Sequence, residues 1–411
     1  MIKNIISSFF TRGAVAAINL LILLISSKQL GGEIIGQVTV MILNITIIQI
    51  VNEIYTGYSL VHFIARFSLK KIYTTGLLWT VICIAILNGV FILLNIGGIK
   101  ALWLHVALLS FMGTLNSFHC VMLLAKQNIK AYNFLVFFQP AVLLIVLCCQ
   151  VFVLGNRSVE AYVFSMYVSF SLALLASVFF VLRLLSRQHK QNNEPRFKAM
   201  LKNGFINQAG NLAHTLSNRY NFYLIGSTLL IGVFSRASAL IESVWLVGAS
   251  ITPLVLTRVA NQDNDSANGR ITFMLSKISL VLSLLCIIFV LCLPQNFFVF
   301  LLGSDFSDVK MLMLYLSPGV LCISFSTVIS HHFSGKGEQK VQLLANCLGL
   351  LVTMCTAPYL ISRYGLTGAC YAASLSYFMQ SLVLTIVFMR HNGFHFRLLF
   401  SFKKDLDLLR K

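Results

Sequence analysis

Five polar side chains recur with helical spacing in the middle of the chain. Asn203, Asn207, Asn211, His214 and Asn218 are separated by four, four, three and four residues, so they fall on one face of a helix. Amide and imidazole groups hydrogen-bond polar ligands, and exposing such a face to lipid is costly. The spacing therefore predicts either the lining of a cavity that binds a polar substrate or a contact between helices.

Charged side chains within or beside long apolar runs form a second group of candidates. Glu53 lies deep in such a run. It can exchange a proton, since burial favours the neutral carboxyl group, or it can hold helices together in an ion pair. Arg12 lies at the edge of another run, where it can line a cavity or extend to lipid headgroups. Arg236 and Glu242 lie on helix faces about 120° apart, so we expect contacts with neighbouring helices rather than with each other.

The composition indicates the environment that these residues occupy. Of the 411 residues, 58% are hydrophobic and only 10% are charged, with a mean hydropathy of +0.85. Soluble domains usually carry about 25% charged residues. The apolar residues form runs of roughly 20, which span a bilayer as helices because lipid cannot satisfy backbone polar groups. The sequence therefore predicts an all-α, polytopic integral membrane protein.

We predict about twelve spans. They cover 10–27, 35–64, 72–94, 101–124, 132–154, 159–184, 201–218, 223–254, 271–293, 309–331, 341–361 and 366–389. A polar, basic loop divides six spans from six. The predicted organisation is an N-terminal six-helix bundle (1–184), a cytoplasmic linker (185–200), a C-terminal six-helix bundle (201–389) and a basic cytoplasmic tail (390–411). A weak internal similarity at an offset of 196 pairs Gly36 with Gly232.

Basic residues predict the orientation. Of the 31 basic residues, 24 lie on the side that holds both termini and six lie on the other side. Arg219 is one of the six, and the remaining basic residue, Arg236, lies within a span. By the positive-inside rule, both termini are cytoplasmic. The net charge of +19 is therefore mostly a matter of topology, and its spread over many short loops disfavours nucleic acid as a partner. Membrane lipids are the expected contacts of these residues.

Other classes of chemistry find little support in the sequence. The ten cysteines lie in apolar runs without a CxxC pair or a His/Cys metal spacing, and no P-loop motif is present. No cofactor or metal is expected. The predicted outer loops are short, with scattered acids only, which disfavours an enzyme such as a membrane polymerase.

Several segments resemble the polysaccharide (O-antigen, Wzx-type) flippases of the multidrug/oligosaccharidyl-lipid/polysaccharide exporter superfamily. They are TRGAVAAINLLILLISSKQLGGEIIGQ (11–37), GFINQAGNLAHTLSNRYNFYLIG (204–226), LLGSDFSDVKMLMLYLSPGV (301–320) and LGLLVTMCTAPYLISRYGLTGACYAASLSY (348–377). Their order and spacing cover most of the chain.

The resemblance implies two six-helix bundles around a central, cationic cavity, and alternating access for an undecaprenyl-diphosphate-linked oligosaccharide in a bacterial inner membrane. Arg12, Arg219 and Arg236 match positions where relatives place basic residues. Tyr220-Asn221 stand where relatives commonly show Leu-Asp, so a coupling acid is absent there. A polysaccharide polymerase and chain-length proteins are the partners that the resemblance suggests.

The expected function is therefore a flippase for surface polysaccharide export, with a drug/cation antiporter of the same superfamily as the alternative. The candidate residues fall into two groups. The expected substrate-binding residues are Arg12, Arg219, Arg236, Asn207, Asn211, His214 and Asn218, and the candidate coupling acids are Glu53 and Glu242. A cationic drug would favour acidic cavity groups, whereas the basic residues here favour an anionic substrate.

Overall fold

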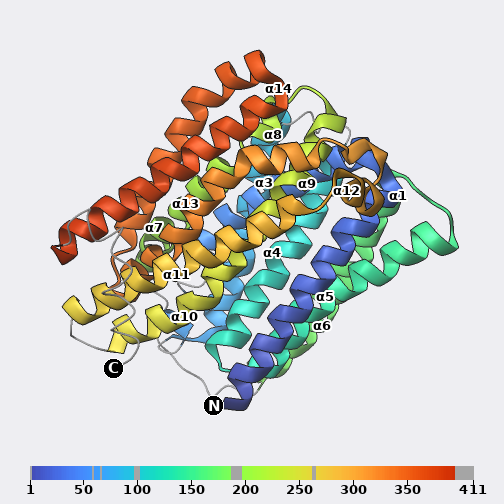
Figure 1. Cartoon of the computed structure of the whole chain (residues 1–411). Helices are drawn as coiled ribbons and strands as arrows, with labels where there is room; N and C mark the ends of the chain where they lie inside the picture. Colours follow the sequence, from blue (N-terminus) through green and yellow to red (C-terminus); the bar gives the residue numbers. More distant parts are fainter. Residues whose placement is uncertain are drawn as a thin grey trace. The chain divides into compact units, whose positions relative to one another are not determined.

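The computed structural model describes residues 2–57, 60–64, 67–96, 102–186, 197–261 and 265–393. These residues form helices joined by short turns, without a strand among them (Figure 1). Eight of the described helices are long and apolar enough to cross a membrane, and two of these are long enough to cross twice. The prediction of an all-α, polytopic membrane protein with about twelve spans is confirmed.

Two of the long helices each join a pair of predicted spans. Helix α1 (Ile2–Thr56) is interrupted at Gly31, which has φ 80° and ψ 171°, and α14 (Gln339–Asn392) at Gly365, which has φ 59° and ψ −132°. Glycine adopts these positive φ angles without the steric cost that a β-carbon imposes. Each break therefore separates two spans that follow one another without a loop. The second predicted span was too long, because its helix ends at Thr56 and not at 64.

The break in α1 is closed by a side chain from far along the chain. The backbone N–H of Gly32 donates to the carboxylate of Asp305 at 2.9 Å, and Asp305 belongs to the short 3₁₀ helix η3 (Ser304–Phe306). A helix that starts again after a break leaves unpaired N–H groups, which an aspartate oxygen satisfies well. Asp305 is thus a capping residue of the restarted helix.

Most of the remaining helices follow the predicted spans, whereas α12 lies between the spans predicted at 271–293 and 309–331 and the span predicted at 223–254 differs. They are α2 (Leu60–Ile64), α3 (Leu69–Leu93), α4 (Trp103–Ala125), α5 (Ile129–Cys148) with the π-helical turn η2 (Cys149–Val153), α6 (Val159–Ser186), α7 (Phe197–Arg219), α11 (Asp265–Cys292), α12 (Gln295–Leu302) and α13 (Val309–Gly335).

The single span predicted at 223–254 is wrong. This part of the chain forms α8 (Asn221–Leu224), α9 (Thr228–Glu242) and α10 (Trp245–Asn261). Between α9 and α10, the hydroxyl of Ser243 donates to the carbonyl oxygen of Leu240 at 2.6 Å, and the amide of Val244 donates to Ile241 at 3.2 Å. These short-range bonds replace helical i→i−4 bonds and end α9.

The chain divides into two compact units, each with its own core. Unit 1 comprises Met1–Leu212, Gly226–Gly232 and Val299–Phe306, and unit 2 comprises Ala213–Ile225, Val233–Phe298 and Ser307–Lys411. In unit 1, α1 packs against α3, α4 and α5, and α4 and α5 pack against α6. In unit 2, α13 packs against α10, α11 and α14. The predicted bundle limits at 184 and 201 stay a prediction, since most of the linker and of the tail lies outside the described residues.

Large side chains fill both cores. Tyr55, Phe118 and Met122 are fully buried in unit 1. Phe333 and Phe388 are buried in unit 2, where their rings meet edge to face. These clusters hold the helices that carry the polar residues described next.

Candidate functional site

Within unit 1, a hydrogen-bonded chain surrounds Glu53 on α1. One carboxylate oxygen accepts a bond from the hydroxyl of Ser117 on α4 at 2.7 Å, and the other accepts from the side-chain amide of Gln208 on α7 at 3.5 Å. The Gln208 carbonyl in turn accepts from the amide of Asn211 at 3.3 Å. Both groups that contact the carboxylate are therefore neutral, and the chain runs from Glu53 to an exposed residue of α7.

The predicted polar face of α7 behaves as two groups. Asn203, Asn207 and Asn211 are exposed, and Asn211 belongs to the Glu53 chain of unit 1. His214 and Asn218 belong to unit 2, where the amide of Asn218 donates to the imidazole Nε2 of His214 at 3.2 Å. The five residues share a helix face, but they contribute to different sites.

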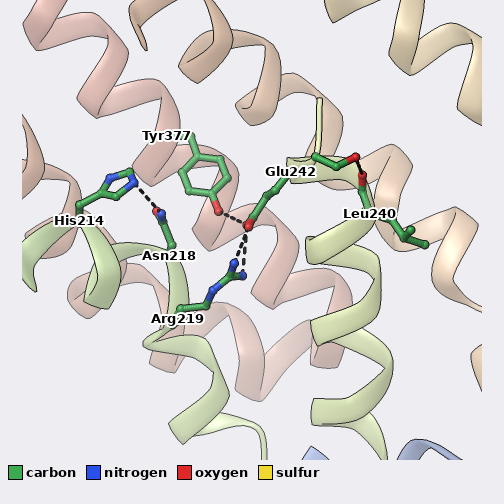
Figure 2. A network of polar contacts seen from close by, with 7 residues as sticks. His214, Asn218, Arg219, Leu240, Glu242 and Tyr377 are labelled. Carbon is green, nitrogen blue, oxygen red and sulfur yellow. Dashed lines mark hydrogen bonds and ion pairs between the residues drawn. The ribbon is translucent and has the colours of Figure 1, made fainter. Parts of the chain in front are cut away.

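Within unit 2, an ion pair joins α7 to α9 (Figure 2). The two guanidinium nitrogens of Arg219 contact the two carboxylate oxygens of Glu242 at 3.3 and 2.6 Å. This fork-to-fork geometry is the strong form of an arginine–carboxylate contact. Glu242 thus pairs with a neighbouring helix, as expected, and not with Arg236.

A third residue completes the group that we call the Arg219–Glu242–Tyr377 cluster. The hydroxyl of Tyr377 on α14 donates to the Glu242 carboxylate at 2.7 Å. Arg219 also lies over the Phe222 ring, with its guanidinium carbon 5.5 Å from the ring centroid. The ring of Trp245, at the start of α10, meets that of Tyr377 in a T-shaped contact at 5.6 Å. The cluster therefore connects α7, α9 and α14 at the point where α9 ends, and its ring contacts add α8 and α10.

A second polar network of unit 2 continues from His214. Its Nδ1 lies 3.3 Å from the side-chain carbonyl of Gln380, whose amide donates to Ser217 at 2.8 Å. The Ser217 hydroxyl contacts that of Ser376 at 2.5 Å. With its proton on Nδ1, His214 donates to Gln380 and accepts from Asn218, so both ring nitrogens are satisfied. His214 is therefore part of a helix–helix network within unit 2.

The other basic candidates lie in different surroundings. Arg12 is exposed on the first half of α1, and Arg236 is partly buried on α9. Lys277 of α11 is only 3% exposed and lies 5.0 Å from the centroid of the Phe273 ring. Arg12 belongs to unit 1, whereas Arg236 and Lys277 belong to unit 2.

The sequence did not identify the residues that hydrogen-bond to these candidate site residues. Ser117, Gln208, Tyr377 and Gln380 are single polar residues within helices, and their spacing forms no pattern. A weak signal was present in the sequence, because Gln208 and Gln380 are amides within predicted spans, where polar side chains are costly. The structure shows that both are almost fully buried. Their partners on other helices can only be identified in three dimensions.

Comparisons with known proteins identify the fold. No family model and no curated protein matches the chain. A structure of the lipid II flippase MurJ in an inward closed conformation is 13% identical, with a TM-score of 0.76 over 94% of this chain and 87% of that one. An inward-facing multidrug resistance MATE family transporter of the MOP superfamily is 14% identical, with a TM-score of 0.71 over 92% of this chain and 94% of that one.

An outward-facing MATE family transporter gives a TM-score of 0.65 at 14% identity, over 95% of this chain and 96% of that one. These likenesses extend over nearly the whole chain and include both a flippase and drug transporters. The chain therefore shares the multi-pass helical fold of these transporter structures.

Proposed function

We propose that the protein is a flippase that moves an undecaprenyl-diphosphate-linked oligosaccharide repeat unit from the cytoplasmic to the outer leaflet by alternating access. The observation that carries this proposal is the exposed amide face of α7. Asn203, Asn207 and Asn211 are exposed in unit 1, whereas α3 and α6 of the same unit expose apolar residues such as Leu78 and Leu175. An amide face suits water or a polar ligand, and the apolar faces suit lipid.

The chemistry of a glycan fits such a face. Each sugar hydroxyl that enters hydrocarbon without a hydrogen-bond partner costs several kcal/mol, about 4–8 on alkane scales. Asparagine side chains both donate and accept, so one row of them can pair with hydroxyl groups in several orientations. A face of this kind binds sugars loosely, which suits a protein that must release its substrate.

The charges of the membrane helices support an anionic headgroup. Basic residues outnumber acidic ones among these candidates: the basic residues are Arg12, Arg219, Arg236 and Lys277, and the acidic residues are Glu53 and Glu242. A diphosphate carries negative charge that guanidinium groups bind well. A cationic drug would favour the reverse balance. The basic residues on the side of the termini support placement in a bacterial inner membrane with both termini in the cytoplasm.

Deletion of the gene in its own host tests the proposal. Surface polysaccharide should be lost, and completed lipid-linked repeat units should accumulate on the cytoplasmic leaflet. Lipid extracts analysed by mass spectrometry measure the intermediate, and an impermeant glycan-binding probe assigns its leaflet. Complementation with the wild-type gene is the control for effects on neighbouring genes.

Two other results would contradict the proposal. Single repeat units on the outer leaflet would point to a polymerase. Intact polysaccharide with raised drug sensitivity would point to a drug/cation antiporter, and structures of multidrug resistance MATE family transporters share this fold.

A further inference from the structure

The carboxylate of Glu242 binds the guanidinium of Arg219 with the geometry that a phosphate group would adopt. Two parallel contacts from one guanidinium to two oxygens are the geometry that arginine adopts with carboxylate and phosphate alike. Phe222 supports the guanidinium from one side. Arg219 is thus already oriented for a doubly hydrogen-bonding anion, and Glu242 is the anion that it holds in this structure.

The two partners differ in their access to the surroundings. The Arg219 side chain is 28% exposed, whereas that of Glu242 is only 6% exposed. An incoming anion can therefore reach the guanidinium without first displacing protein atoms from its exposed edge. Glu242 is held from behind by the Tyr377 hydroxyl, and Tyr377 is only 1% exposed. When Arg219 binds another anion, the Glu242 carboxylate keeps its hydrogen bond from the Tyr377 hydroxyl and is not left without a partner.

Two residues next to members of the cluster carry polar atoms without a hydrogen-bond partner. Among the described residues, the side-chain oxygen of Asn218 and the indole nitrogen of Trp245 are buried without a hydrogen-bond partner. Asn218 precedes Arg219 in the chain, and Trp245 contacts Tyr377. Such atoms are rare in native structures and often mark a place where a ligand supplies the missing bond. Together they offer one acceptor and one donor on residues adjacent to Arg219 and Tyr377.

From these observations we infer that Arg219 is a diphosphate-binding residue and that Glu242 is its built-in competitor. This inference rests on the proposed function and deepens it. A partly buried arginine without a carboxylate would hold a diphosphate tightly and slow its departure. Because Glu242 competes for the same guanidinium, the diphosphate is bound briefly and then released. Arg219 ends α7 on the predicted outer side, so the exchange belongs to the release of the lipid-linked product.

Binding measurements on the purified full-length protein in lipid nanodiscs test this exchange. The probes are undecaprenyl diphosphate, undecaprenyl monophosphate and inorganic pyrophosphate, each titrated by calorimetry. Glu242→Gln removes the competing charge and keeps the side-chain shape, so it should bind undecaprenyl diphosphate about tenfold more tightly than wild type. The double variant Arg219→Ala/Glu242→Gln should lose that gain. Glycan export in cells should fall several-fold with Glu242→Gln.

The matched controls come from exposed residues of the same unit. Glu338→Gln removes the acid of an exposed contact with His391, and Arg363→Ala removes an exposed arginine that bonds Tyr359. Neither should change the affinity. A gain with inorganic pyrophosphate as well as with the lipid shows that the headgroup alone is recognised. A gain confined to the lipid shows that the lipid tail also contributes, and both results support the site.

Three results would overturn the inference: unchanged affinity in Glu242→Gln, an equal gain for the monophosphate, or a gain that persists without Arg219. If Glu242→Gln does not fold, Tyr377→Phe tests the inference instead. This variant keeps both charges and removes only the hydrogen bond that holds the Glu242 carboxylate. It should show a smaller gain, and no gain would contradict the exchange. If cells without the protein export polysaccharide normally while Glu242→Gln binds diphosphate tightly, the proposed function is wrong and the diphosphate site stands.

Discussion

Gly232 of α9 lies against the backbone carbonyl of Gly32 in α1, so closely that no β-carbon fits on Gly232. Four residues later in α1 and four residues earlier in α9, Gly36 meets the backbone of Thr228 in the same way. The two contacts are related by the offset of 196 that pairs Gly36 with Gly232 in the sequence, since Thr228 is the counterpart of Gly32. The internal similarity thus corresponds to a symmetric crossing of two helices within unit 1.

Alanine at this crossing should destabilise the protein. In Gly36→Ala, the new methyl group meets backbone atoms of Thr228, which cannot move aside as a flexible side chain can. Overpacking of this kind costs about 1–3 kcal/mol or more. The yield of monodisperse protein and its melting temperature should both fall. Gly89→Ala is the matched control, because nothing lies within 4 Å of a β-carbon there, and equal behaviour of the two variants would contradict the prediction.

Arg12 should matter for transport and not for folding. It is exposed, so Arg12→Ala leaves the packing of α1 intact, yet it removes a guanidinium that can bind a diphosphate at two points. Export of the glycan should fall several-fold at unchanged protein abundance, and Arg12→Lys should restore part of it. Lys70→Ala, at an exposed basic position of α3, controls for loss of charge near the membrane surface. Equal export in both alanine variants would mean that Arg12 is an orientation signal only.

Glu53 is our candidate for coupling transport to a proton gradient. Its contacts are the neutral groups of Ser117 and Gln208, and Asn211 leads from them to the surface of unit 1. Glu53→Gln keeps the size of the side chain but cannot exchange a proton. Transport in proteoliposomes should therefore lose its response to an imposed proton gradient, while the protein still folds.

The control for this experiment is Glu33→Gln, which changes an exposed acid of the same helix and should leave the response unchanged. A Glu53→Gln variant that remains fully sensitive to an uncoupler shows that the proton is carried elsewhere. The other candidate, Glu242, can act as a carrier only after its pair with Arg219 opens.

The predicted orientation can be tested at two exposed turns. Gln339 begins α14 on the predicted cytoplasmic side, and Asn156 lies between η2 and α6 on the predicted outer side. With the ten native cysteines replaced, Asn156→Cys in intact cells should react with an impermeant maleimide, and Gln339→Cys should react only after lysis. Labelling of the Gln339 position from outside would reverse the topology. The basic residues also predict that Gln191 and the C-terminus are cytoplasmic and that Gly98 is outside, but these positions lie outside the described residues.

Most of the fold could be predicted from the sequence, because the hydrophobic effect acts on whole runs of residues. Eleven of the twelve predicted spans correspond to single helices or to halves of α1 and α14, although the second was predicted too long. The two breaks at glycine left no loop in the sequence and so could not be distinguished from short turns. The break between α9 and α10 was missed because it depends on single hydrogen bonds of Ser243 and Val244 rather than on composition.

The candidate site was predictable only in part. The sequence indicated that Glu242 would meet another helix, since the spacing excluded Arg236. It could not identify Arg219 as the partner, because that contact depends on how α7 and α9 pack. It also treated five polar residues of α7 as one group. Which of them are exposed and which are bonded depends on Gln208 and Gln380, whose positions follow no helical period.

The polarity of α7 also bears on how the protein is made. This helix carries three exposed asparagines and two lysines, and it is not among the helices apolar enough to cross a membrane by composition. Asparagine and lysine both oppose the partition of a nascent segment from the translocon into lipid. We therefore expect that helix α7 does not enter the bilayer alone and inserts together with an apolar neighbour. Biogenesis of the second half then depends on cooperation between segments, not on their arrival one at a time.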